Sequence, residues 1–164
     1  MGERAGQWVA GGLAVVLVAL LVAIGLVVTG QDDGDAGLTA AQQDVAAAAR
    51  AEALAVLTVD HEDMAPLIDA VLDGATGEFA EQYDAQRDTL TSEAVRTEAT
   101  STPEVVSLGV GDQDGDSATV LVAANSTVTN SSTAGEGQVR YYRLRLELVR
   151  EGERWLTSNM EFVR

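Results

Sequence analysis

The chain has 164 residues, enough for one ordinary domain and one appended segment. It contains no cysteine, so disulfides and thiolate metal sites are excluded. Its formal net charge of −16 argues against a nucleic-acid partner and against a domain that lies flat on an anionic bilayer.

An uncharged, mostly apolar run covers residues 8–30 and can cross the roughly 30 Å hydrocarbon core of a bilayer as one helix. The alternative is a cleaved signal peptide, whose apolar region is normally only about 7–15 residues long. The length favours an uncleaved single-pass anchor, with residues 1–7 as a short tail. Arg4 precedes the run and three aspartates follow it, so the tail is expected in the cytoplasm and the C-terminal domain outside the plasma membrane.

Residues 31–38 are predicted to form an acidic, flexible linker, and residues 39–164 the extracytoplasmic domain. A capping box of Thr39 and Gln42 predicts the start of an alanine-rich helix that runs to about Val59.

A second helix is predicted after Asp63, where apolar residues recur at helical spacing and Gly74 suits the end. Its stripe consists of Met64, Leu67, Ile68, Val71 and Leu72 and is expected to pack into the core. A third helix is predicted from about Thr76 into the nineties, with inward residues Phe79, Tyr83 and Leu90.

The apolar period then changes from 3.6 to 2, which predicts about four strands joined by short connections and therefore antiparallel. The alternating residues are Val106, Leu108 and Val110; Ala118, Val120, Val122 and Ala124; Tyr142, Leu144, Leu146 and Leu148; and Leu156, Met160 and Phe162. The predicted fold class is α+β, with three helices packed on one face of a curved antiparallel sheet of about four strands.

Two acidic clusters could carry chemistry. Residues 60–63 place the only histidine, His61, among carboxylates, where it could act as a general base. Polar residues in a helix–helix connection also serve as caps and solvent-facing groups, and this interpretation is favoured. Residues 112–116 resemble a calcium loop, but position 12 is Ala123 where a bidentate glutamate is needed, so a hairpin turn is predicted. No catalytic, cofactor-binding or metal-binding residues are predicted.

The C-terminal hairpin is the basic part of an acidic chain, because residues 140–164 contain six arginines and four glutamates. Tyr141, Arg143 and Arg145 share one face of the predicted strand. They can contact an acidic partner or an anionic lipid headgroup. The alternative is that the arginines form cross-strand pairs with acidic residues.

Several segments together resemble the Mce-associated membrane proteins of actinobacteria. They are the N-terminal anchor, "AAAARAEALAVLTVD", "GATGEFAEQYDAQRDTL" and the closing "EGERWLTSNMEFV". The resemblance covers nearly the whole chain. It implies a cystatin-like, nuclear-transport-factor-2-like cone of helices on a curved sheet. It also implies a non-enzymatic accessory subunit that stabilises or connects an Mce lipid-import system, with its subunits as partners and without a cofactor.

The same fold also hosts SnoaL-like cyclases and ketosteroid isomerases, so the alternative function is an anchored small-molecule-binding or enzymatic domain. Two or more buried carboxylate, histidine or tyrosine groups converging in an open pocket would favour it. The predicted inward patterns are almost wholly apolar. Trp155 is expected to close the core at the start of the last strand. Strict alternation places it opposite Leu156, so this role requires a bulge or twist.

Overall fold

The computed structural model describes residues 37–133 and 135–163. The chain divides into two compact units, residues 1–36 and residues 37–164. The predicted tail, the predicted anchor at residues 8–30 and most of the predicted linker therefore lie outside the described residues. Within the part of the chain that is described, none of the helices is both long enough and apolar enough to cross a membrane.

The long helix α2, Ala40–Leu57, begins where the capping box predicts. The backbone N–H of Gln42 donates to the Thr39 hydroxyl at 3.3 Å, and the Thr39 N–H donates to the Gln42 side-chain oxygen at 3.0 Å. These bonds satisfy N–H groups that have no partner within the first turn. One stripe of α2 is buried, and its small side chains allow the sheet to approach closely; the stripe consists of Val45, Ala46, Ala49, Glu52, Ala53 and Leu57.

The helix ends at Leu57, earlier than predicted, because the chain there turns into a short strand. Strand β1, Val59–Asp60, pairs antiparallel with β2, with Val59 opposite Ser101 and Asp60 opposite Thr100. Two residues are too few to show a strand period. The strand exists because a distant segment supplies its hydrogen-bond partners.

Helix α3, Met64–Gly74, presents the predicted stripe to the interior. Ile68 and Val71 are 0% exposed, and Leu67 packs half-buried against the cluster that contains Ile68. The prediction that this stripe belongs to the core is confirmed. Asp63 takes the N-cap position but makes no side-chain capping bond.

The predicted third helix is divided into α4, Gly77–Ala85, and α5, Arg87–Thr97. Gln86 between them has φ −94° and ψ 0°, outside the usual helical range. The Arg87 guanidinium, at the joint, lies 2.9 Å from the carboxylate of Asp69 in α3. The prediction of one continuous helix is therefore wrong. The same guanidinium also lies 3.0 Å from the carboxylate of Asp84 in α4, so Arg87 links the joint to both α3 and α4.

The side chains predicted to point inward from this segment are half-buried. Tyr83 and Leu90 pack against the small cluster formed by Met64, Ile68 and Ala94. Phe79 contacts the Tyr83 ring, with the centroids 6.1 Å apart. These contacts place α4 and α5 against α3.

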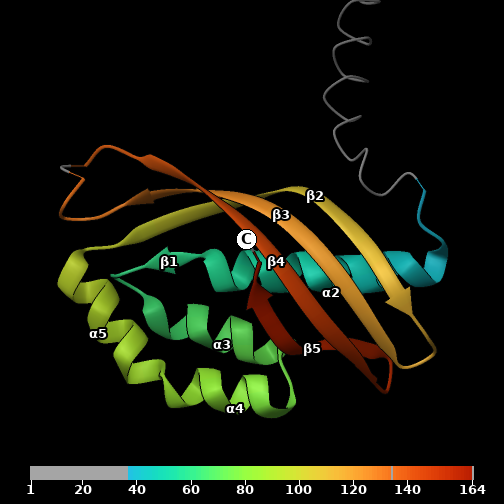
Figure 1. Cartoon of the computed structure of the whole chain (residues 1–164). Coiled ribbons are helices and arrows are strands. Elements are labelled where there is room, and N and C mark those ends of the chain that lie inside the picture. The colour runs from blue at the N-terminus through green and yellow to red at the C-terminus, as the bar shows by residue number, and fades with distance from the viewer. Residues whose placement is uncertain (1–36, 134, 164) are drawn as a thin grey trace, which may run out of the picture. The chain divides into compact units, whose positions relative to one another are not determined.

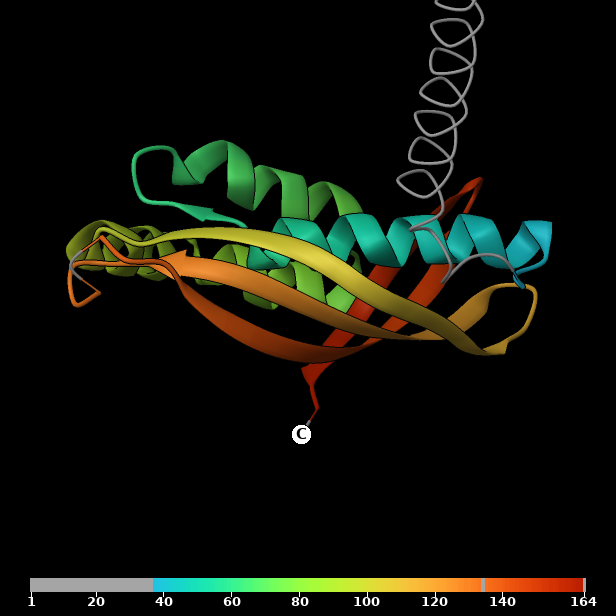
Figure 2. The ribbon, with the colours of Figure 1, turned by 90° about the horizontal axis from the view of Figure 1, so that it is seen from above.

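The strands form one sheet in the order β1-β2-β3-β4-β5, with every neighbouring pair antiparallel. The long strands bend around α2, which lies along the concave side of the sheet (Figures 1 and 2). The described residues thus contain four helices and five strands, not three helices and about four strands. The fold class α+β is confirmed; the four remaining strands are β2 (Thr100–Gln113), β3 (Ser117–Thr129), β4 (Gln138–Glu151) and β5 (Arg154–Phe162).

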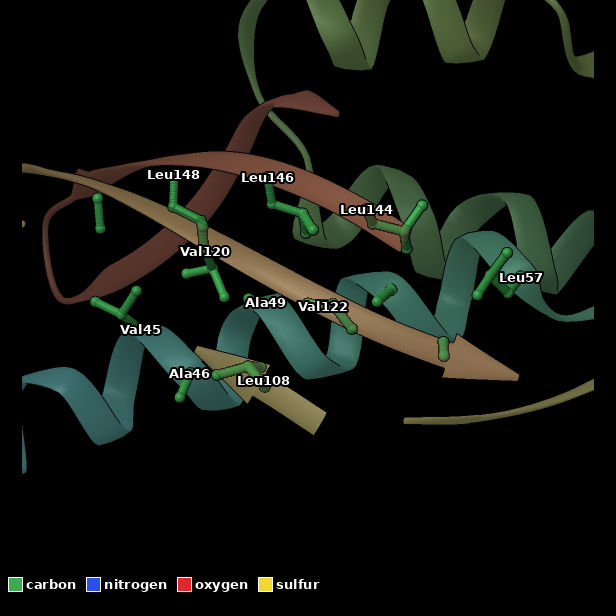
Figure 3. Packing of buried hydrophobic residues seen from close by; sticks show 13 residues of the cluster. Val45, Ala46, Ala49, Leu57, Leu108, Val120, Val122, Leu144, Leu146 and Leu148 are labelled. Carbon is green, nitrogen blue, oxygen red and sulfur yellow. The ribbon is translucent and has the colours of Figure 1, made fainter. Parts of the chain in front are cut away.

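The larger hydrophobic cluster lies between α2 and the concave face of the sheet (Figure 3). Leu144, Leu146 and Leu148 of β4 are at most 1% exposed, and each fully buried leucine stabilises the fold by about 1.5–3 kcal/mol. The predicted alternation is confirmed for β3 and β4. The buried residues of β3 are Ala118, Val120, Val122, Ala124 and Ser126.

A bulge in β2 changes which valine faces the core. The register with β3 shifts between Val105 and Ser107, so Val105 packs against the core while Val106 is 59% exposed. An extra residue in one strand reverses the alternation on one side of it. The prediction that Val106 shares a face with Leu108 is therefore wrong.

A second bulge places Trp155. Leu146 of β4 pairs with Met160, but Leu148 pairs with Thr157, so β5 contains one residue more than β4 in this interval. Trp155 and Thr157 consequently face the core, and Leu156 takes the other face. The bulge that a core position for Trp155 requires is present, and the ring is partly buried against the main cluster. The placement of Leu156 beside Met160 is wrong for the same reason.

Candidate functional site

The outer face of β4 carries the three side chains predicted as a contact surface, Tyr141, Arg143 and Arg145. They alternate with the buried leucines, and Tyr141 is 74% exposed. Arg143 lies opposite Ala123 of β3, whose small side chain leaves the guanidinium open to solvent. We refer to Tyr141, Arg143 and Arg145 as the β4 outer face.

The two arginines of this face differ in their partners. Arg145 lies 3.1 Å from the carboxylate of Glu147 and 3.9 Å from that of Glu161 on β5, so it forms the acidic pairs expected as the alternative. Arg143 has no side-chain ion pair with any described residue. Leu121, which lies opposite Arg145 on β3, is 54% exposed. The face therefore offers one free guanidinium beside apolar and aromatic surface.

The cluster at residues 60–63 forms a solvent-facing loop between β1 and α3. The Asp60 carboxylate accepts the backbone N–H of Glu62 at 3.0 Å, and the His61 ring nitrogen Nδ1 lies 3.3 Å from the Ala99 carbonyl oxygen. The turn-forming interpretation of this cluster agrees with the structure. At the other acidic cluster, Asp114 accepts the backbone N–H groups of Asp116 and Ser117, which makes the predicted hairpin turn.

Glu52 is the buried acid of the domain. It projects from α2 toward the end of α3 and is 3% exposed. A Cβ atom at Gly74 would overlap its Oε2, so only glycine permits the carboxyl group to lie there. Its Oε1 has no hydrogen-bond partner among the described residues. Burying a carboxyl group in this way penalises its charged form.

The surroundings of Glu52 keep it protonated at neutral pH. Burial, and to a smaller degree the negative charge of Asp73, raise the pKa of Glu52 from 4.5 to about 8. Burial first, and the charge of Glu52 second, also raise the pKa of Tyr83. A neutral carboxylic acid can donate a hydrogen bond as well as accept one.

Glu52 lines a pocket of about 430 Å³ on the helical side of the sheet, which we call the Glu52 pocket. Trp155 forms part of its wall. At the rim, the Arg154 guanidinium donates to the Asp73 carboxylate at 2.9 Å and to the Asp73 carbonyl oxygen at 2.7 Å. The remaining wall is mostly methyl groups from α2 and α3, namely Ala48, Ala51, Ala55 and Ala70.

A second buried polar atom lies near the same helix end. Thr157 of β5 is 0% exposed, and its hydroxyl has no partner among the described residues. Its backbone forms an isolated parallel bridge with Ala75, the residue after Gly74. Glu52 and Thr157 thus both lie close to the end of α3.

Sequence reasoning missed Glu52, although a signal for it existed. Glu52 falls three residues after Ala49 and seven after Val45, at the helical spacing that places it on the same side of α2 as these two buried residues. The expectation of an almost wholly apolar interior is wrong at this position. A glutamate at such a position normally lies at the edge of the buried face of a helix. The burial of Glu52 becomes apparent only from its packing against Gly74 in the structure.

Solved structures share the architecture of this domain. An IcmL-like type IV secretion system protein from Legionella pneumophila matches with a TM-score of 0.60 and 10% identity, over 77% of this chain and 94% of that chain. A ketosteroid isomerase-like protein from Erwinia carotovora atroseptica matches with a TM-score of 0.52 and 20% identity, over 77% of this chain and 99% of that chain. At these identities the likeness concerns the fold alone. The domain has the nuclear-transport-factor-2-like fold, as the resemblance implied.

The chain belongs to the family described as "Uncharacterized protein Rv1363c/MT1408-like", whose model matches residues 7–164. The protein Rv1363c of Mycobacterium tuberculosis is 30% identical over 118 residues, which is 72% of this chain. The chain spans 45% of the length of that relative. Neither description names Mce machinery.

Proposed function

We propose that this chain is a membrane-anchored, non-enzymatic accessory protein whose extracytoplasmic domain binds an acidic segment of a partner protein through the β4 outer face. The observation that carries the proposal is Arg143, an exposed arginine without an ion pair among the described residues, beside the 74% exposed ring of Tyr141. The charge contrast supports an acidic partner, because the C-terminal hairpin contains six arginines and four glutamates while the whole chain has a net charge of −16. Arginine with an exposed aromatic ring is a common composition of protein-binding surfaces.

The anchor is part of the proposal. Residues 8–30 contain no charged residue and have the length of a single span, with the basic flank on the cytoplasmic side. The similarity in fold to a type IV secretion system protein supports an accessory role in a membrane-bound machine for secretion or transport. The finer proposal, an Mce-type lipid-import system of the cell envelope, is supported by the resemblance of the segments in the sequence.

The alternative, an anchored SnoaL-like small-molecule-binding or enzymatic domain, would be favoured by two or more buried titratable groups that converge in an open pocket. Of the described residues that line the Glu52 pocket, Glu52 is the buried acid, while Asp73 is exposed and paired with Arg154. Tyr83 responds to the charge of Glu52 but does not line the pocket. This arrangement favours the accessory role over catalysis.

The test compares the full-length protein with an Arg143→Ser and Arg145→Ser double variant in a mycobacterial host. Proteins are crosslinked in intact cells, the tagged chain is purified, and Mce subunits are quantified by mass spectrometry for each folded molecule recovered. We expect Mce subunits with the wild type and at least a tenfold loss with the double variant. An Arg96→Ser variant removes an exposed arginine of α5, away from the face, and should recover as much as the wild type.

Two outcomes would contradict the proposal. Equal recovery of Mce subunits by the wild type and the double variant would place the contact elsewhere. Absence of Mce subunits, together with arginine-dependent binding to phosphatidylglycerol vesicles, would make the β4 outer face a lipid contact.

A further inference from the structure

The Glu52 pocket combines features that packing alone leaves unexplained. Glu52 is nearly fully buried, and its Oε1 has no hydrogen-bond partner among the described residues. A buried polar group without a partner destabilises a protein, so natural folds rarely contain one. Oε1 itself is enclosed by the protein, whereas the other carboxyl oxygen, Oε2, lies against Gly74. Glu52 and Gly74 both line a space of about 430 Å³, which is in the range of small-molecule sites.

We propose that the Glu52 pocket binds a small, neutral, mostly apolar molecule through one carbonyl oxygen, which accepts a hydrogen bond from the carboxylic acid of Glu52. The site lies on the helical side of the sheet, whereas the β4 outer face is on the other side. The proposal therefore goes beyond partner docking and holds or fails independently of it.

The walls determine the apolar character of the ligand. The wall consists of four alanine methyl groups and the partly buried indole of Trp155. Such an apolar wall favours binding of an apolar molecule over a polar or hydrated one. Ala51 and Ala70 are exposed in the absence of a ligand, so their methyl groups would be removed from water when one binds. A flat ring system has the shape that an indole and helix methyl groups can cover.

The charges around the pocket disfavour an ionic ligand. Asp73 of α3 repels an anion, and the Arg154 guanidinium of β5 repels a cation. These two groups already satisfy each other at the rim. With anionic and cationic ligands both disfavoured, a neutral carbonyl compound is the class of ligand that fits the pocket.

The protonation state of Glu52 decides whether it can donate. The titratable or charged groups around it are Asp73 from α3, Arg154 from β5 and the phenol of Tyr83 from α4. Strand β3 presents aliphatic side chains to the cluster beneath α2, and β4 presents leucines and Tyr142. Burial raises the pKa of Glu52 to about 8, so the acid is protonated at pH 6.5 and ionised at pH 9.5. An ionised carboxylate cannot donate and repels a carbonyl oxygen.

The experiment measures two probes of equal size by ligand-observed NMR with the full-length protein. 2-Acetylnaphthalene carries a carbonyl acceptor, and 2-ethylnaphthalene does not. At pH 6.5 we expect the ketone to bind roughly tenfold more tightly, as one hydrogen bond to a buried acid allows. At pH 9.5 we expect this preference to disappear.

Three variants locate the effect. Glu52→Leu should abolish the preference for the ketone, while Glu52→Gln should keep it at both pH values because the amide donates without titrating. Ala51→Phe fills the pocket from an exposed helix position and should weaken both probes at least tenfold without unfolding the domain. Glu62→Gln removes an exposed glutamate of the β1–α3 loop and should behave as wild type.

Several results would overturn the proposal. Failure of both probes to bind would show that the pocket takes no small apolar ligand. Equal affinity for the two probes, or a ketone preference that survives in Glu52→Leu, would remove Glu52 from recognition. Binding unchanged in Ala51→Phe would place the probes elsewhere. Tighter binding of 2-naphthylmethylammonium than of the ketone would show that the site prefers a cation over a neutral ligand.

Discussion

The two faces of β4 share one backbone, yet they have different roles. On the inner face, Leu144, Leu146 and Leu148 are buried and join the sheet to α2. On the outer face, Tyr141 and Arg143 make few contacts within the domain. Successive side chains of a strand point to opposite faces. Alternate residues of one strand can therefore stabilise the fold, while the residues between them are free to contact a partner.

The largest effect is expected from the same substitution on opposite faces. Leu146→Ala removes a fully buried side chain and leaves a cavity, so the free energy of unfolding should fall by about 2–5 kcal/mol. Leu121→Ala, at a 54% exposed position of β3, should change it by less than about 0.5 kcal/mol. Urea unfolding of the two variants measures both values. Similar losses would mean that the outer face is also packed.

A smaller contrast is expected between two aromatic residues. Trp155 is only partly buried, so Trp155→Ala should lower the free energy of unfolding by about 2–4 kcal/mol, less than for a fully enclosed ring. Tyr141→Ala should lower it by no more than about 0.5 kcal/mol, because the ring is 74% exposed. The same unfolding measurement applies. A Trp155→Ala protein as stable as wild type would show that the bulge in β5 does not bring the indole into the core.

The buried acid should give the inner region its own pH dependence. The pKa of Glu52 is about 8 in the folded protein and near its usual value when unfolded, so between about pH 4.5 and pH 8 the folded state binds more protons. The free energy of unfolding therefore falls as pH rises through this window, by up to about 1.4 kcal/mol per pH unit. The Glu52→Gln variant should lack this pH dependence of the free energy of unfolding. Its free energy of unfolding, compared with that of the wild type, should therefore increase from pH 4.5 to pH 8. A constant difference between the two proteins across the window would contradict the protonated state.

The smallest effect is expected on the outer face. Arg145 pairs with Glu147 and Glu161 at exposed positions, where such pairs contribute about 0–1 kcal/mol. Arg143→Ser with Arg145→Ser should therefore lower the free energy of unfolding by less than about 1 kcal/mol. Thermal unfolding in low and high salt measures this value. A larger loss would make the arginines part of the fold, and the comparison between the faces would fail.

Local patterns in the sequence were sufficient where neighbours along the chain decide the structure. The capping box at Thr39, the stripe containing Ile68 and the alternation of β3 and β4 depend on residues within a few positions of one another. A helix start or a strand face follows from such spacing. Tyr141, Arg143 and Arg145 share one face of β4 for this reason, and their contact with a partner stays a proposal.

Only the tertiary structure decided the features that depend on distant segments. The exposure of Val106 and the inward position of Trp155 follow from extra residues accommodated between paired strands. Glu52 is interior because Gly74 has no side chain to displace its carboxyl group. In each case the energy comes from a contact between elements that are separated in the sequence, so no local period could reveal it.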